Sequence, residues 1–164
     1  MTRRNFVSAL GALFAAHKVA QAAEPKKSAA PAAGGVQKLD LSEDEWRKRL
    51  TSEQFAVLRN EATERPGSSP FNAEHRKGTF VCAGCDLPLF DSSTKFESGT
   101  GWPSFFTYIP AHLETRTDFK LILPRTEYHC ARCGGHQGHV FDDGPKPTGK
   151  RYCNNGVALK FIPA

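Results

Sequence analysis

The chain contains five cysteines, and their spacing divides them into two kinds. Four form two C-x-x-C pairs, Cys82 with Cys85 and Cys130 with Cys133, while Cys153 stands alone. Paired thiolates at this spacing are typical metal ligands, whereas a lone thiol beside proton-carrying side chains can act as a nucleophile. The pattern therefore favours a thiol enzyme built around a metal site.

The two cysteine pairs are separated by 44 residues, 86–129. This gap exceeds the roughly 15–20 residues of a compact zinc ribbon, so a shared ion is expected to hold two distant hairpins together. Four thiolates favour zinc, with iron as a weaker candidate. Two structural disulfides are the alternative, because an oxidising compartment converts paired thiols to disulfides.

Cys153 lies in a polar segment, residues 151–155. In a strand, Arg151, Cys153 and Asn155 share one face. The guanidinium favours ionisation of the thiol, and the Asn155 amide can orient the sulfur or donate to an oxyanion. A buried, inert cysteine is the alternative, although a core strand would flank it with apolar side chains. Asn155 and Gly156 can also form a turn that ends the strand.

Two histidines, His136 and His139, precede Cys153 in a glycine-rich segment. Imidazole is the natural proton carrier near neutral pH, so both are candidates for acid–base work. Structural histidines or additional metal ligands are the alternatives, although four cysteines already complete a tetrahedral site. His112 and His129 have no comparable polar setting, and we interpret them as structural or surface groups.

A second glycine-rich segment, residues 99–106, gathers aromatic residues around Trp102. Such a cluster is more often core than binding site. Its glycines and single indole also suit a platform for a small apolar group.

The first 22 residues are typical of an export signal. Paired arginines are followed by an apolar run of 11 residues at 6–16 and by a small-x-small cleavage pattern at 20–22. The run is shorter than the about 20 residues that span a bilayer, and a buried or amphipathic helix is the alternative. The arginines resemble a twin-arginine signal, whose route carries folded, metal-loaded proteins. We therefore expect cleavage, a periplasmic location and no stable membrane insertion afterwards.

Residues 23–38 are rich in Ala, Pro, Gly and Lys, which predicts a disordered linker before one domain at 39–164. The formal net charge of +5 lies entirely before residue 39, where six basic side chains accompany one acidic side chain. Residues 39–164 carry 16 of each sign. Because the domain has no net field to attract phosphates, we expect no nucleic-acid partner.

Capping boxes at 42–45 and 51–54 predict two short helices, the second reaching Asn60, with Trp46, Leu50, Phe55 and Leu58 in the core. Short strands separated by glycine and proline are then expected at 79–81, 113–117, 120–123, 127–129 and 157–162. The expected fold class is α+β and mainly β: a small antiparallel, barrel-like domain with one or two N-terminal helices, stapled by the four-cysteine zinc site.

Three segments together resemble methionine sulfoxide reductase B. They are Ser98–Phe105 (SGTGWPSF), Gly135–Gly149 (GHQGHVFDDGPKPTG) and Arg151–Asn155 (RYCNN). Both C-x-x-C pairs also fall where that family places its zinc ligands, and the resemblance covers about Leu41 to Pro163. It implies a zinc-stapled β fold and thiol-dependent reduction of the R epimer of methionine sulfoxide, chiefly in proteins, as a repair activity.

The resemblance also assigns residues by position. The implied set is Cys153 as nucleophile, His139 and Asn155 for proton delivery, His136 and Asp143 in support, and Trp102 and Arg151 at the substrate. Many family members have a second, resolving cysteine where this chain has Thr100. A sulfenic acid formed on Cys153 is therefore expected to be resolved by an external thiol, either a small thiol or a thioredoxin-like protein.

Two other functions are compatible with parts of the sequence. The first is a zinc-ribbon-like binding module without catalysis, and the neutral domain and long cysteine spacing count against it. The second is a cysteine hydrolase that uses Cys153 with His139, and no obvious oxyanion hole supports it.

Overall fold

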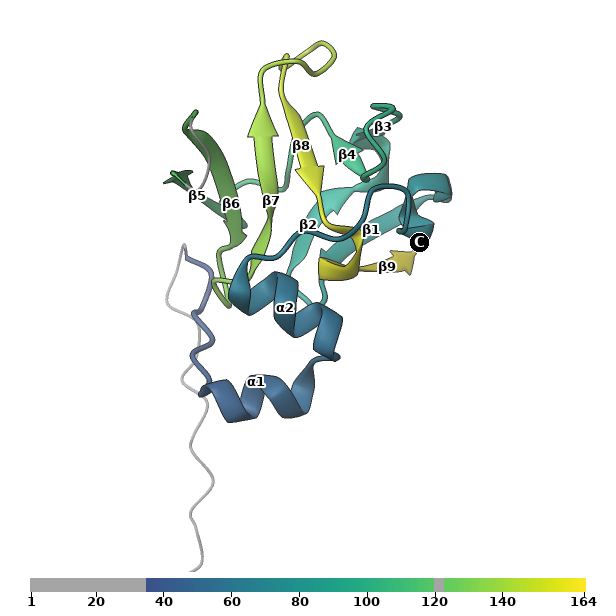
Figure 1. Cartoon of the computed structure of the whole chain (residues 1–164). Helices are drawn as coiled ribbons and strands as arrows, with labels where there is room; N and C mark the ends of the chain where they lie inside the picture. Colours follow the sequence, from purple (N-terminus) through teal and green to yellow (C-terminus); the bar gives the residue numbers. More distant parts are fainter. Residues whose placement is uncertain (1–34, 120–122) are drawn as a thin grey trace, which may run out of the picture. The chain divides into compact units, whose positions relative to one another are not determined.

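The computed structural model describes residues 35–119 and 123–164, in which two antiparallel sheets are joined to two short helices (Figure 1). The predicted export signal and most of the predicted linker lie outside these residues and stay predictions. The strand expected at 120–123 also falls mainly outside them. In the described ranges, no helix has the length and apolar character needed to cross a membrane.

The smaller sheet has the strand order β2-β1-β9 and the larger sheet the order β3-β4-β8-β7-β6-β5. The strands are β1 (Gly78–Cys82), β2 (Pro88–Asp91), β3 (Lys95–Phe96), β4 (Ser104–Phe105), β5 (Leu113–Asp118), β6 (Arg125–Cys130), β7 (His136–Phe141), β8 (Arg151–Asn154) and β9 (Leu159–Pro163). Short 3-10 turns occupy η1 (Pro70–Ala73), η2 (Ser92–Thr94) and η3 (Gly156–Ala158). The mainly β fold class with short N-terminal helices is confirmed.

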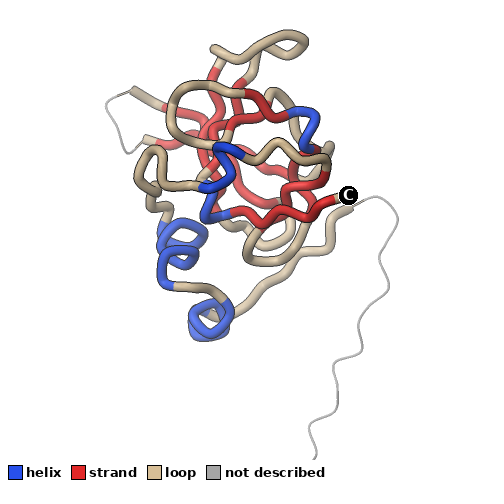
Figure 2. Tube along the Cα trace, turned by 90° about the vertical axis from the view of Figure 1, so that its right-hand side faces the viewer, coloured by secondary structure: helices blue, strands red, loops and turns tan. Residues whose placement is uncertain are grey.

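Both helices begin where the sequence predicts. In α1 (Glu43–Arg49), the Ser42 hydroxyl accepts from the backbone N–H of Glu45, and the Glu45 side chain accepts from the backbone N–H of Ser42. In α2 (Ser52–Asn60), Thr51 and Gln54 form the same two hydrogen bonds. Each box satisfies two backbone donors that the helix leaves unpaired. The four predicted core residues of this region are all buried. Figure 2 shows the two helices together at one end of the strands.

Aromatic rings from both sheets form the core. Phe90 of β2 stacks on Phe105 of β4 with ring centroids 4.1 Å apart, and Phe80 of β1 meets Phe105 edge-on at 5.0 Å. Tyr128 of β6 and Tyr152 of β8 continue this cluster. Burying each ring contributes about 1.5–3 kcal/mol, so this cluster fixes the position of β4 and β8 relative to the smaller sheet.

The strand expected at 157–162 begins later, at Leu159, because η3 occupies Gly156–Ala158. The cause is Glu64, whose two carboxylate oxygens accept from the backbone N–H groups of Gly156 and Val157. A Cβ at Gly156 would lie 1.8 Å from the Ser69 hydroxyl, so only glycine fits this close approach. The turn predicted as an alternative at Asn155 and Gly156 is therefore present.

Candidate active site

Cys153 lies on β8, between β4 and β7 in the larger sheet. It pairs with Ser104 on one side and with His139 on the other. The neighbouring strand approaches closely here, since a Cβ at Gly138 would lie 1.9 Å from the Cys153 carbonyl oxygen. The sequence thus places the lone thiol on a rigid central strand, directly opposite a histidine.

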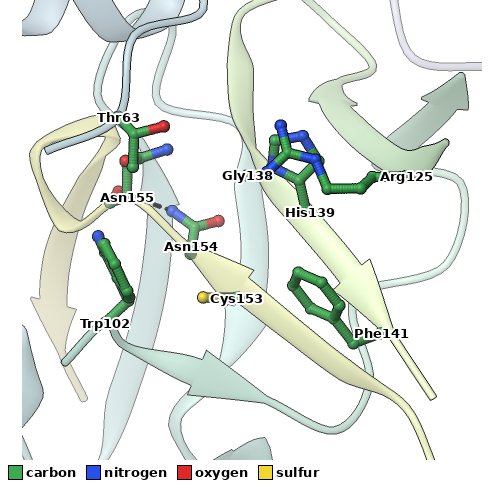
Figure 3. Close-up of a pocket in the computed structure, with 9 residues that line it drawn as sticks. All are labelled: Thr63, Trp102, Arg125, Gly138, His139, Phe141, Cys153, Asn154 and Asn155. Atoms are coloured by element: carbon green, nitrogen blue, oxygen red, sulfur yellow. Dashed lines mark hydrogen bonds between the residues drawn. The ribbon is translucent and has the colours of Figure 1, made fainter. Parts of the chain in front are cut away.

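A pocket of about 110 Å³ opens beside the Cys153 sulfur. In the view of Figure 3, the sulfur lies between the rings of Trp102 and Phe141, and His139 and Arg125 lie together above Phe141. Among the predicted site residues, Cys153, His139, Asn155 and Trp102 line this pocket. His136, Asp143 and Arg151 are not part of its lining, and each of them has other contacts.

Burial raises the pKa of the Cys153 thiol, and the Arg151 guanidinium and the Thr100 hydroxyl oppose this rise only in part. The favourable effect of Arg151 that the sequence predicts is therefore present, but desolvation outweighs it. Arg151 is also engaged by Asp143, whose carboxylate accepts two hydrogen bonds from it at 2.8 Å. At neutral pH the resting group is a thiol.

The raised pKa predicts how Cys153 reacts with an alkylating agent. A thiol whose pKa lies above the assay pH reacts in proportion to its thiolate fraction, so the rate should rise about tenfold per unit between pH 7 and 8. Timed iodoacetamide labelling, followed by peptide mass spectrometry, measures this rate at position 153. A rate that is already constant at pH 7 would show a resting thiolate instead.

His139 is held by a buried carboxylate. Its Nε2 lies 2.8 Å from Oδ2 of Asp118, and Asp118 in turn accepts from Arg125 at 2.6 Å. Because a carboxylate only accepts, Nε2 carries the proton and Nδ1 keeps the lone pair. Burial lowers the pKa of His139 despite the opposing effect of Asp118, which keeps the ring neutral at pH 7.

Trp102 and Asn155 are oriented by backbone groups. The Trp102 indole N–H donates to the carbonyl of Glu64 at 3.2 Å. Asn155 accepts from the Glu64 N–H at its Oδ1 and donates from its Nδ2 to the carbonyl of Gln137, both at 3.0 Å. The Asn155 amide therefore links the turn that follows β8 to Gln137 and to Glu64, the residue whose carbonyl holds the Trp102 indole.

His136 lies next to the pocket, with its ring centroid 5.4 Å from that of His139. It is 1% exposed, and its Nδ1 lies 3.1 Å from a carboxylate oxygen of Glu127. His136 thus contacts both the ring of His139 and the carboxylate of Glu127.

The four paired cysteines meet between the two sheets. Their loops are the β1–β2 and β6–β7 connections, as the long spacing predicts. The sulfurs of Cys82 and Cys133 lie 3.6 Å apart, and those of Cys85 and Cys130 lie 3.4 Å apart. A disulfide would bring two sulfurs to about 2.0 Å, and all four cysteines are free thiols in this structure.

The geometry of this cluster fits a tetrahedral ion. Zn–S bonds of about 2.3 Å place ligand sulfurs about 3.8 Å apart, close to the observed separations. The Gln137 amide donates to the Cys82 sulfur at 3.4 Å, as expected for a polar group around metal-bound thiolates. The four cysteines thus form a group that could hold a metal ion, and it joins β1 to β6.

Comparison with known proteins assigns the family. Residues 50–163 match the SelR domain. The chain belongs to the SelR domain family. A protein of Pseudomonas putida (strain W619) named peptide methionine sulfoxide reductase MsrB is 54% identical over 130 residues, which cover 78% of this chain and 97% of that protein. A Bradyrhizobium diazoefficiens protein of the same name is 52% identical over 127 residues, covering 77% of this chain and 91% of the relative.

A plant protein is also similar to this chain. The chloroplastic peptide methionine sulfoxide reductase B1 of Arabidopsis thaliana is 53% identical over 122 residues. That region is 74% of this chain and 60% of the plant protein, so the chain spans less than two thirds of this relative's length.

Several residues at this site were not among the site residues predicted from the sequence. No sequence pattern marked Asp118, Arg125 or Phe141 as site residues, because their roles depend on strand register and on burial. Asp118 and Arg125 face each other across β5 and β6, a pairing that only the hairpin register reveals. Glu127 is the cross-strand neighbour of His139, and it lies within a strand that we did predict.

Proposed function

We propose that this chain reduces the R epimer of methionine sulfoxide in proteins to methionine. The observation that carries the proposal is the half-buried Cys153 thiol in a small pocket with aromatic walls and a neutral histidine. The pocket is smaller than the about 300–1,000 Å³ of typical ligand sites, so it suits the end of one side chain. Aromatic rings favour contact with an S-methyl group.

The first chemical step transfers oxygen from the substrate to Cys153. The Cys153 sulfur gains a bond to oxygen, the sulfoxide S–O bond breaks, and the thiol becomes a sulfenic acid. The substrate sulfur gains two electrons and the cysteine sulfur loses two. The thiol proton ends on the transferred oxygen, so the step needs a group that carries a proton over a short distance.

His139 has the properties of that proton carrier. Asp118 holds Nε2–H, so the neutral ring keeps a lone pair on Nδ1 that can take the thiol proton of Cys153, its cross-strand neighbour. An imidazolium formed for a moment beside this carboxylate can then protonate the departing sulfoxide oxygen. A neutral resting histidine and a protonated resting thiol thus make a consistent pair.

Regeneration requires two external thiols. The first attacks the sulfenic sulfur, releases water and forms a mixed disulfide, and the second releases Cys153 as a thiol. Thr100 stands where a resolving cysteine would be, and the other four cysteines belong to the metal cluster. We therefore propose a small thiol or a thioredoxin-like protein as reductant.

Mass spectrometry after a single turnover without reductant tests this resolution step. The expected product is one added oxygen on the Cys153 peptide, which a small thiol then converts to a mixed disulfide. An internal disulfide between Cys153 and any of the four paired cysteines would refute external resolution.

We propose zinc as the ion of the four-cysteine cluster, because four thiolates in a closed tetrahedral arrangement are typical of structural zinc. Bound there, zinc would cross-link β1 to β6 and would take no part in the reaction. The residues that hold it would be Cys82, Cys85, Cys130 and Cys133.

The decisive assay of the function compares the two separated sulfoxide epimers of a peptide substrate, with dithiothreitol as reductant. We expect turnover of the R epimer only. A pocket that holds the S-methyl group against an aromatic wall directs the sulfoxide oxygen toward His139 in only one of the two epimers. Equal turnover of the S epimer, or no turnover by folded, metal-loaded protein, would overturn the proposal.

Asp118→Asn tests the role of His139 in this reaction. The amide introduced at position 118 can donate to Nε2 of His139 and so favour the tautomer that carries its proton on Nδ1. Because this tautomer cannot accept the thiol proton at Nδ1, we expect kcat to fall about 10²-fold with little change in KM. Because Asp118 raises the pKa of His139, its loss should also move the acid limb of the pH profile to lower pH.

The matched control is Asp142→Asn, an exposed aspartate that pairs with Lys150 and should keep activity within twofold. Unchanged kcat and an unchanged acid limb in Asp118→Asn would remove Asp118 as the positioning residue.

A further inference from the structure

Three ligand-type side chains gather on the β6–β7 hairpin outside the Cys153 pocket. Glu127 and His129 come from β6 and His136 from β7, and they are 3%, 8% and 1% exposed. One ligand atom from each lies within 4.8 Å of the others. We propose that these three side chains form a second metal site, which takes a divalent transition-metal ion of the zinc type.

The interatomic distances fit one shared ion. Nδ1 of His136 lies 3.1 Å from Oε2 of Glu127, and Nε2 of His129 lies 3.4 Å from Oε1. Zinc bonds of about 2.0–2.1 Å to nitrogen and oxygen place tetrahedral ligands about 3.3 Å apart. The two observed separations, each to a different oxygen of the Glu127 carboxylate, are close to this value.

The hydrogen bonding of His129 supplies a second reason. Its Nδ1 lies 3.1 Å from the carbonyl oxygen of Gly134, which only accepts, so Nδ1 carries the proton. Nε2 of the same ring faces the Glu127 carboxylate at 3.4 Å. Nε2 is buried, and the Glu127 oxygen that it faces also accepts a hydrogen bond from Arg116. A buried carboxylate between two imidazole rings, away from water, is a donor set that suits a shared cation.

This arrangement is the one that metal-bound histidines adopt. One ring nitrogen donates to a backbone carbonyl, which fixes the ring and turns the other lone pair toward the ion. A ligating carboxylate is usually hydrogen-bonded as well, and here Arg116 donates to Glu127. Arg116 also donates to Glu61, so its single positive charge serves two carboxylates.

The same hairpin carries ligands of both clusters. His129 precedes Cys130, and His136 follows Cys133 by three residues. Folding of the β6–β7 hairpin therefore assembles two thiolates of one site and all three ligands of the other. An ion bound at Nδ1 of His136 would also fix the ring that contacts His139. This inference does not depend on the proposed reductase activity.

Metal content of wild-type protein and His129→Gln tests the inference. After incubation with excess zinc and removal of free metal, we expect two ions per wild-type chain and one per His129→Gln chain. His112→Gln is the matched control, because His112 also contacts a backbone carbonyl through Nδ1 but lies outside the cluster, and it should retain two. One ion in the wild type, or equal content in the wild type and His129→Gln, overturns the inference.

Cobalt(II) titration of the wild-type protein requires no variant. One equivalent should produce thiolate-to-cobalt charge-transfer bands from the cysteine cluster. A second should add ligand-field bands without further charge transfer, because its ligands are nitrogen and oxygen. A second equivalent that leaves the spectrum unchanged would show that a proton, and not a metal ion, bridges Glu127 and His129.

Discussion

Replacing Cys153 by serine is expected to reduce methionine sulfoxide turnover at least 10⁴-fold, to the background of the assay. A sulfur can lose two electrons and hold the transferred oxygen as a sulfenic acid, whereas a hydroxyl oxygen cannot. The serine is smaller and similar in shape, so the pocket beside Trp102 and His139 should persist. The measurement is steady-state turnover of the R epimer with dithiothreitol, at equal protein and metal concentrations.

The same variant should still bind substrate. Trp102 lines the pocket, so its fluorescence should respond to the oxidised peptide in Cys153→Ser as it does in the wild type. Retained binding with lost turnover assigns Cys153 to the chemical step. If Cys153→Ser kept a tenth or more of the wild-type rate, oxygen transfer to this sulfur would be refuted.

Local patterns account for the features that the sequence predicted well. The capping boxes at Ser42 and Thr51 involve residues three apart, so they do not depend on the rest of the fold. The two C-x-x-C loops are also local. Each has a residue with positive φ four positions after its first cysteine, Asp86 at +60° and Gly134 at +67°. To predict that the two loops lie together, it was enough to assume that both cysteine pairs bind one ion.

Tertiary burial accounts for what the sequence could not predict. The expected thiolate at Cys153 rested on Arg151 alone, whereas the folded chain desolvates the thiol more strongly than the guanidinium stabilises its anion. Asp118 becomes the partner of His139 only after β5, β6 and β7 pair in register. His129, interpreted from sequence as a structural or surface group, is 8% exposed and faces Glu127. In each case the deciding neighbour is distant in sequence or hidden by strand register.

Replacing Cys130 by serine is expected to remove the ion of the four-cysteine cluster and to unfold the domain at room temperature. Structural zinc binding contributes about 10–16 kcal/mol in small zinc domains, which is comparable to the whole stability of a typical domain, about 5–15 kcal/mol. The remaining thiolates of Cys82, Cys85 and Cys133 would also stay buried without their shared counter-charge. Thermal unfolding by circular dichroism and metal content by mass spectrometry measure both effects.

Cys153→Ser is the matched control for this prediction, because it makes the same chemical change at a cysteine outside the cluster. It should keep the wild-type metal content and melt within a few degrees of the wild type, while Cys130→Ser should lose cooperative melting. The pair thus separates the two kinds of cysteine in one experiment: one variant loses the reaction and keeps the fold, and the other loses the fold. A Cys130→Ser protein with wild-type metal content and melting would mean that the cluster does not hold the two sheets together.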